Sequence, residues 1–323
     1  MILAGDIGGT KTLLALARTG DGGPGILHER RYASRDWPDF AAVVRAFADE
    51  SGLREPISAA CFGVAGAVEG NRAKVTYLPW EIDGPALARS FGVRRIEVLN
   101  DFAAAAQGVA DLPAADLVPL QEGHPLASAP RLLIGAGTGL GVAALLPDGD
   151  GWRTLGGEGG HVGFCPADEA QRAVMRHLQR QRRRVTAENV ISGPGLLAIY
   201  DCLRQDAPAA APLADAAAIA AAAASEPVAG QALDLFIAAY GAFAGDLALL
   251  FMARGGVYLG GGIAPKIVSR LQQGGFLRAF AARDAHAGLM AGFPLHVIRN
   301  ERLGLLGALR IAARLAAAPD GAQ

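Results

Sequence analysis

The sequence predicts an α/β protein with two domains, and three observations support this fold class. The chain has 323 residues, about twice the length of a common domain. Apolar residues make up 51% of the chain, which is enough to fill two hydrophobic cores. A pattern of strand, glycine-rich loop and strand occurs over residues 3–16 and again over residues 131–146, which suggests a duplicated fold.

Charge and cysteine content exclude several classes of protein. The formal net charge of −1 gives no overall field that would attract nucleic acid or an anionic membrane. The three cysteines are far apart and form no CxxC pair, so we expect a reducing compartment, no disulfide framework and no zinc site. We expect no signal peptide at the N-terminus. Asp246 interrupts the apolar residues 235–252, which favours a buried helix over a membrane span.

The first glycine-rich loop lies between the apolar runs 1–4 and 13–17 and contains Gly5, Asp6, Ile7, Gly8, Gly9 and Thr10. The simplest interpretation is a β-hairpin. Glycines also let backbone N–H groups approach an anion, and a threonine hydroxyl adds a donor, so a phosphate loop is the second interpretation. It is not a Walker A loop, because Thr10 separates Gly9 from Lys11, and the spacing of the Rossmann fingerprint is absent.

Asp101 lies between a predicted strand, residues 96–99, and an alanine-rich helical run, residues 103–110. Ligands bind at the carboxyl ends of strands in open α/β sheets. A carboxylate at this position either caps the helix or acts as a general base on a bound ligand. Capping is the commoner role for an isolated Asp, and the glycine loops elsewhere in the chain shift the balance towards the base.

Three further stretches are candidates for ligand contact. Gly137, Thr138 and Gly139 lie in the second strand–loop–strand pattern. Glu158 and His161 are surrounded by five glycines, so a ligand contact and a local hydrogen bond are equally supported. Gly260, Gly261 and Gly262 follow the strand 257–259, and such a junction can admit a flat ring against the backbone.

The remaining elements follow from periodicity and from turn residues. We expect helices at 39–50, 85–91, 168–184, 207–226, 233–252 and 303–318, strands at 57–64 and 293–299, turns at 21–25 and 192–195, and a linker at 111–130.

Six segments in this order resemble the ATP-dependent sugar kinases of the actin-like superfamily, and most closely the bacterial glucokinase family, which is related to the ROK sugar kinases. They are GDIGGTKT from Gly5, LNDFAA from Leu99, IGAGTGLGVA from Ile134, GGEGGHVGF from Gly156, ENVISGPG from Glu188 and YLGGGIAP from Tyr258. The resemblance covers nearly the whole chain. It implies a two-lobed fold with an RNase-H-like sheet in each lobe and a ligand cleft between them. The small lobe would comprise residues 1–110 and 303–323, and the large lobe residues 111–302.

The resemblance also implies an activity, the transfer of the γ-phosphoryl group of ATP to the 6-hydroxyl of glucose at the entry to glycolysis. Asp101 resembles the catalytic base, and the resemblance implies sugar contacts from Asn100, Glu158, His161 and Glu188. Residues 5–10 resemble the first phosphate loop, with Asp6 near Mg²⁺. Residues 137–139 resemble the second phosphate loop, and residues 260–262 resemble the adenosine motif. A cytoplasmic enzyme is expected, with homodimers common among relatives.

Three positions depart from the family pattern. Only Cys165 stands where ROK relatives carry clustered cysteines, so no zinc is expected. Lys11 and Tyr77 stand where glucokinases often carry Asn, and Tyr77 leaves strict glucose preference open. The alternatives are a kinase with a broader range, such as mannose, fructose, an N-acetyl amino sugar or polyphosphate as donor, and a sugar sensor without catalysis.

Overall fold

The computed structural model describes residues 1–20, 23–52, 54–149 and 151–319. Its internal contacts divide the chain into two compact units. Unit 1 contains Met1–Leu112, Trp152–Gly156 and Asn300–Gln323, and unit 2 contains Pro113–Gly151 and Gly157–Arg299. The short segment Trp152–Gly156 therefore groups with unit 1, although the sequence places it in the middle of the expected large lobe.

Unit 1 is built on a five-stranded mixed sheet of order β3-β2-β1-β4-β8. β1 (Ile2–Ile7) pairs antiparallel with β2 (Lys11–Arg18) and parallel with β4 (Ala59–Val64). β4 pairs parallel with β8 (Arg95–Asn100), and β2 pairs antiparallel with β3 (Gly25–Ala33). The first glycine-rich loop is thus the predicted hairpin between β1 and β2, while β3 was not predicted.

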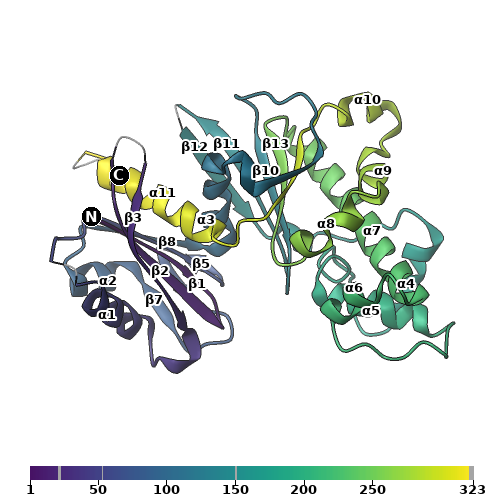
Figure 1. Cartoon of the computed structure of the whole chain (residues 1–323), viewed down its shortest axis with the longest axis horizontal. Coiled ribbons are helices and arrows are strands. Elements are labelled where there is room, and N and C mark those ends of the chain that lie inside the picture. Colours follow the sequence, from purple (N-terminus) through teal and green to yellow (C-terminus); the bar gives the residue numbers. More distant parts are fainter. Residues whose placement is uncertain (21–22, 53, 150, 320–323) are drawn as a thin grey trace. The chain divides into compact units, whose positions relative to one another are not determined.

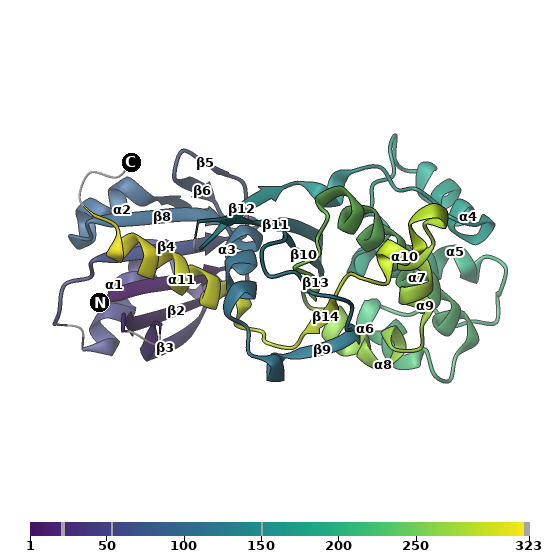
Figure 2. The same ribbon diagram turned by 90° about the horizontal axis from the view of Figure 1, so that it is seen from above.

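Helices cover both faces of this sheet (Figures 1 and 2). α1 (Phe40–Ser51) and α2 (Gly84–Phe91) lie on one face, and α3 (Asp101–Gly108) and α11 (Leu303–Ala317) lie on the other. The alternation of side chains along β1 explains this, because Leu3 packs in the core below α1 and Ile2 packs against α11. A small three-stranded sheet completes the unit: β5 (Val68–Glu69), β6 (Arg72–Lys74) and β7 (Glu81–Asp83).

A second sheet has six strands in the order β12-β11-β10-β13-β14-β9, and apart from Trp152–Gly156 of β12 its residues belong to unit 2. β10 pairs antiparallel with β11 and parallel with β13, just as β1 pairs with β2 and β4, so the predicted duplication is confirmed. The strands are β9 (Leu117–Gln121), β10 (Arg131–Ala136), β11 (Leu140–Asp148), β12 (Gly151–Gly157), β13 (Gly256–Gly260) and β14 (Leu295–Ile298).

The central helix of unit 2 is α7 (Pro227–Phe251), which packs against β10 and several helices. Among the described residues it is the one helix long and apolar enough to cross a membrane, a test that buried core helices also pass. Side chains of Phe236, Ile237 and Tyr240 lie in the largest hydrophobic core, as expected for a core helix. The other helices of the unit are α4 (Glu169–Gln179), α5 (Gly193–Arg204), α6 (Ala216–Ala222), α8 (Val268–Leu271), α9 (Gly275–Ala281) and α10 (Ala287–Met290).

Several predicted elements differ in the structure. The expected linker 111–130 contains the edge strand β9, and the expected helix 168–184 ends at Gln179. Of the alanine-rich residues 207–226, only Ala216–Ala222 form a helix in that stretch, because Pro208 and Pro212 interrupt the residues before it. The predicted turn at 192–195 is the start of α5, where the Ser192 side chain accepts a hydrogen bond from the Gly195 N–H.

Candidate active site

Three parallel strands of unit 1 end level with one another. Ile7 of β1 is in register with Val64 of β4, and Val64 is in register with Asn100 of β8. The residues that follow, including Gly8 and Asp101, therefore leave the sheet at the same edge. This is the edge at which α/β sheets bind ligands.

Asn100, and not Asp101, is the N-cap of α3. The Asn100 Oδ1 accepts hydrogen bonds from the N–H groups of Phe102 at 2.9 Å and Ala103 at 3.2 Å. Its Nδ2 donates to the Gly66 carbonyl at 3.3 Å, which ties β8 to the loop after β4. The Asp101 Oδ1 accepts from the Phe102 N–H at 2.8 Å from the first position of the helix. The capping role considered for Asp101 thus falls mainly to its neighbour.

The predicted first phosphate loop is held by two buried hydroxyl groups that the sequence did not single out. The Ser34 Oγ donates to the Gly8 carbonyl at 2.7 Å and lies 3.0 Å from the Thr12 Oγ1. Gly9 packs so closely on the loop before Trp80 that a Cβ would lie 2.6 Å from the Thr76 carbonyl oxygen. A side chain at Gly9 is therefore excluded.

Asp6 lies at the end of β1, on the face that packs against α11. Its carboxylate is so near the first turn of that helix that a Cβ at Gly304 would lie 3.0 Å from it. Burial raises the pKa of Asp6 above its usual value, and the nearby Lys11 ammonium lowers it in part. Asp6 is in register with Gly63, and a Cβ at Gly63 would lie 3.4 Å from the Asp101 Cα. The two carboxylate-bearing residues therefore belong to one sheet edge.

Tyr77 stands beside this loop in a strained conformation. Its φ of 66° lies in the left-handed region, which an aromatic residue seldom adopts. Its side chain is 82% exposed. A Cβ at Gly9 would lie 3.6 Å from the Tyr77 Cβ, so the tyrosine is a direct neighbour of the first phosphate loop.

In unit 2 the predicted second phosphate loop and the predicted adenosine motif lie together. The Gly137 N–H donates to the Gly139 carbonyl at 2.8 Å and closes the loop. Gly261 has a φ of 79°, and a Cβ there would lie 2.5 Å from the Ala136 carbonyl oxygen. The start of α5 joins them, because the Gly193 N–H donates to the Gly137 carbonyl at 2.7 Å.

A cavity of about 450 Å³ opens between these segments. The sequence missed part of its wall, the N-terminal turn of α5 and the side chains of Asp215 and Lys266, although Ser192 and Pro194 also fit the pattern of a helix start. The cavity is lined by Gly137, Thr138, Gly193, Pro194, Leu196, Leu197, Asp215, Ala216, Ala217, Ala220, Gly262, Ile263, Lys266 and Ile267.

Glu188 touches the second phosphate loop. Its Oε2 accepts from the Leu140 N–H at 2.9 Å, and a Cβ at Gly139 would lie 2.7 Å from the same oxygen. Its own N–H donates to the Gly160 carbonyl at 2.9 Å. Glu188 therefore links the second loop to the segment that carries Glu158 and His161.

Glu158 and His161 lie at the surface of unit 2, with side chains 83% and 57% exposed. Their Oε2 and Nε2 atoms are 3.7 Å apart. The neighbouring glycines are required by packing, since a Cβ at Gly160 would lie 2.2 Å from the Leu140 carbonyl oxygen. The backbone is held against β11 while both polar side chains stay available to a ligand.

The described residues contain no group of three or more His, Cys, Asp or Glu side chains that could hold a metal ion by themselves. Mg²⁺ binds with one or two protein carboxylates together with substrate phosphates and water. The single Asp6 carboxylate beside the first phosphate loop fits this kind of site.

The repeated mixed sheet and the glycine loops at its strand ends define a two-lobed, actin-like sugar-kinase fold. The chain belongs to the glucokinase family, whose model, described as Glucokinase, matches residues 3–315. It is 38% identical to the glucokinase of Nostoc punctiforme over 98% of this chain and 99% of that protein.

Two solved structures have the same fold. A glucokinase from an Antarctic psychrotroph superimposes with a TM-score of 0.89 at 28% identity, and the match covers 97% of this chain and 98% of that chain. A ROK family glucokinase from Streptomyces griseus, in complex with glucose and AMPPNP, has a TM-score of 0.64 at 21% identity, covering 97% of this chain and 99% of that one.

Proposed function

We propose that this protein is an ATP-dependent glucokinase, which converts glucose and ATP to glucose 6-phosphate and ADP. One observation carries the proposal: Asp101 stands at the sheet edge that also carries the first phosphate loop, while Asn100 caps the helix. Membership of the glucokinase family and the relatives named above support the same activity.

Asp101 accepts the proton of the sugar 6-hydroxyl as that oxygen attacks the γ-phosphorus. Phosphoryl transfer needs little covalent chemistry from a protein, because in-line positioning and stabilisation of charge supply most of the catalysis. Asn100, Glu158, His161 and Glu188 would bind the remaining hydroxyl groups, which need paired donors and acceptors when they leave water.

The nucleotide is assigned to the predicted glycine segments. The cavity beside Gly137 and Gly262 would take the adenosine, with backbone N–H groups of residues 137–139 and of residues 8–10 directed to phosphates. Asp6 would hold Mg²⁺, directly or through water, and the ion would neutralise charge on the phosphate oxygens.

The direct test is turnover of glucose with MgATP by the purified full chain. A panel of glucose, mannose, fructose and N-acetyl amino sugars, each tested with ATP and with polyphosphate, measures the range of sugars and phosphoryl donors that the protein accepts. Phosphorylation of glucose by ATP is expected. Binding of glucose without product, whatever the donor, would refute the proposal.

Tyr77 favours one second candidate, a hexose kinase of broader range. A flat, exposed ring stands next to the first phosphate loop where glucokinases often carry Asn. An aromatic face packs on the C–H groups of a sugar ring and discriminates little between hydroxyl positions. Comparable kcat/KM values for glucose and mannose would favour this candidate.

Cellular location and assembly are part of the proposal. A reducing cytoplasm suits the three free cysteines, one of which, Cys165, is exposed. A homodimer is expected from the family, and sedimentation of the full chain would test it.

A further inference from the structure

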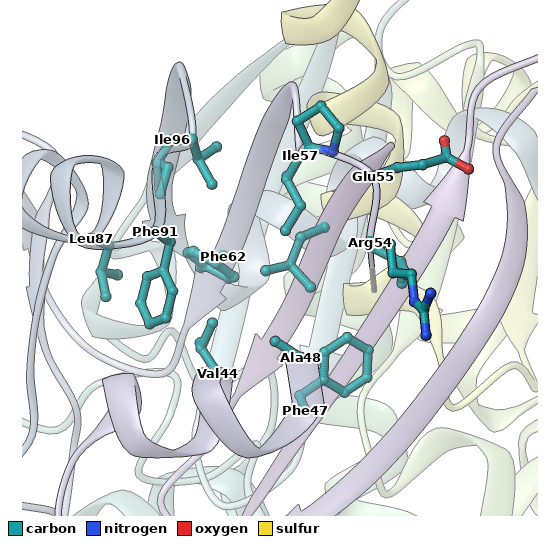
Figure 3. Close-up of a pocket in the computed structure, with 14 residues that line it drawn as sticks. Val44, Phe47, Ala48, Arg54, Glu55, Ile57, Phe62, Leu87, Phe91 and Ile96 are labelled. Carbon is teal, nitrogen blue, oxygen red and sulfur yellow. The ribbon is translucent and has the colours of Figure 1, made fainter. Parts of the chain in front are cut away.

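Unit 1 contains an apolar cavity of about 300 Å³ that the phosphoryl-transfer chemistry does not use. It lies between the sheet face formed by β2, β1, β4 and β8 and the helices α1 and α2 (Figure 3). Its lining residues are Leu3, Leu16, Val44, Phe47, Ala48, Arg54, Glu55, Pro56, Ile57, Phe62, Leu87, Phe91, Val93 and Ile96.

The depth of the cavity is hydrocarbon. Leu3, Phe47 and Phe62 are each no more than 2% exposed, and twelve of the fourteen lining residues are apolar. An apolar cavity of about 150 Å³ stays dry and is large enough to bind benzene. A cavity twice that size, with no polar group in its depth, is suited to an aliphatic chain and poorly suited to a sugar or a nucleotide.

The two charged lining residues lie together on one side. Figure 3 shows Arg54 and Glu55 on the side opposite Leu87 and Phe91. Arg54, Glu55 and Pro56 are exposed, so this side is the opening. Glu55 is already paired, because its Oε1 accepts from the Arg18 guanidinium at 2.6 Å. Within the described part of the chain Arg54 forms no ion pair, so the opening carries a positive charge without a carboxylate partner.

We propose that this cavity binds a medium-chain carboxylate, with its aliphatic chain in the cavity and its carboxylate at the Arg54 guanidinium. The inference does not depend on the proposed function. Leu3 and Ile96 lie near the starts of β1 and β8, whereas Asp6 and Asn100 lie at their ends. The bound carboxylate therefore leaves the candidate active-site edge free and stabilises unit 1 without competing with sugar.

The test compares three probes by thermal unfolding of the full chain: octanoate, acetate, which keeps only the head group, and 1-octanol, which keeps only the chain. Octanoate is expected to raise the melting temperature by several degrees at saturation, 1-octanol by less, and acetate not at all. Arg54→Gln should weaken octanoate binding about threefold to fivefold, as for an exposed ion pair, and leave 1-octanol binding unchanged.

A pair of variants on α1 locates the binding site. Ala48 lines the cavity, and Ala48→Phe should fill it and abolish the octanoate response. Ala46 is half-buried on the same helix but is not part of the lining, so Ala46→Phe should keep the response. If Ala48→Phe does not fold, Ala48→Leu and calorimetric titration of octanoate replace it.

The last measurement repeats thermal unfolding with octanoate in the presence of saturating glucose. The rise in melting temperature with octanoate should persist. Three outcomes would overturn the proposal: no rise in melting temperature with octanoate, an unchanged response in the filled variant, or loss of the response when glucose is added. The last outcome would place octanoate at the sugar site.

Discussion

Two adjacent side chains, Asn100 and Asp101, make different contacts at the start of α3. A carboxylate that caps a helix has its oxygens committed to backbone N–H groups, which lowers its value as a base. Here the neutral amide of Asn100 accepts from two N–H groups of the helix, and the Asp101 Oδ1 accepts from the Phe102 N–H. The sequence pattern LNDFAA therefore places the capping residue Asn100 directly before Asp101, the residue that we propose as the base.

Asp101→Asn should remove the base and keep the fold, because an amide oxygen can still accept from the Phe102 N–H. We expect kcat to fall ~10²–10⁴-fold, with the KM for glucose little changed. The measurement is steady-state turnover with MgATP. The matched control is Asp83→Asn at the N-cap of α2, where Asn is as good a cap and activity should stay normal. Full activity of Asp101→Asn would remove Asp101 from the mechanism.

The left-handed φ of 66° at Tyr77 is an unfavourable backbone conformation for an aromatic residue. Asn adopts this region more readily than an aromatic residue, so Tyr77→Asn should raise the free energy of unfolding by about 1 kcal/mol. Tyr77→Phe keeps the strain and loses only the hydroxyl, so it should give no gain. Denaturant unfolding measures both variants, and an equal change in the two would mean that strain is not the cause.

The raised pKa of Asp6 predicts a pH dependence of stability. Burial favours the protonated form in the folded state, so the native protein holds more protons than the unfolded chain between the usual value of 3.8 and the raised pKa. Stability from this group is therefore intact below the unfolded pKa and is lost as pH rises through the folded pKa.

Asp6→Asn should remove this penalty. At neutral pH the variant should be more stable than the wild type by on the order of 1 kcal/mol, and below the unfolded pKa the two should converge. Urea unfolding across pH measures the difference, and activity should be lost with the carboxylate. A stability difference that stays constant with pH would show that Asp6 does not titrate as proposed.

At the scale of elements, the position of Asp101 depends on how closely α3 meets α11. A Cβ at Gly307 would lie 1.7 Å from the Ala104 carbonyl oxygen, and one at Gly108 would lie 2.5 Å from the Leu303 carbonyl oxygen. Only glycine allows such an approach of two helix backbones. The same crossing sets the first turn of α11 against Asp6.

Gly307→Ala should therefore destabilise the protein by about 3 kcal/mol or more, because backbone must move to make room. Activity should fall as α3 shifts. Gly288→Ala is the control, since a Cβ at Gly288 meets nothing within 4 Å and alanine favours the helix α10. Equal melting temperatures for Gly307→Ala and the wild type would contradict the close crossing.

Local signals explain which elements the sequence could predict. α1 and α2 carry such signals, because each has an aspartate at its N-cap and apolar residues at helical spacing. β9 was missed because Pro119 and its surroundings read as a loop, and proline is tolerated there only because the strand lies at the sheet edge. α5 was missed because Ser192 to Gly195 fits a turn as well as a helix start.

The candidate site also contains some residues that the sequence could predict and others that it could not. Glycine loops and Asp101 have a local pattern that sequence can reveal. Ser34 contacts Gly8, Thr76 contacts Gly9 and Lys266 lines the cavity beside Gly137, and these contacts join residues that are distant in sequence. Such contacts leave no local pattern in the sequence, so only the folded structure identifies them.

At the scale of the whole molecule, the same strand order occurs twice along the chain. β1 and β10 each lead through a glycine loop into an antiparallel partner, and each pairs with a parallel strand on its other side. The duplication explains why each unit carries one of the two predicted phosphate loops. The candidate sugar ligands are also distributed, with Asn100 and Asp101 in unit 1 and Glu158, His161 and Glu188 in unit 2.

Glu158 allows the contribution of unit 2 to be tested without disturbing the fold, because its side chain is exposed and pairs with His161 at 3.7 Å. If Glu158 binds sugar hydroxyls, Glu158→Gln should raise the KM for glucose about tenfold or more, the value of a hydrogen bond to a charged group. The KM for ATP and the stability without ligand should stay unchanged.

Thermal unfolding gives a second readout. Glucose at 100 times its Kd stabilises a protein by about 2.7 kcal/mol, and a tenfold weaker Kd removes about 1.3 kcal/mol of that gain at the same concentration. Glu169→Gln on α4 is the matched control, since this exposed carboxylate pairs with Arg172 and Arg176 and should leave both readouts unchanged. If Glu158→Gln binds glucose normally, Glu158 serves only as a local partner of His161, which is the alternative that its glycine-rich surroundings leave open.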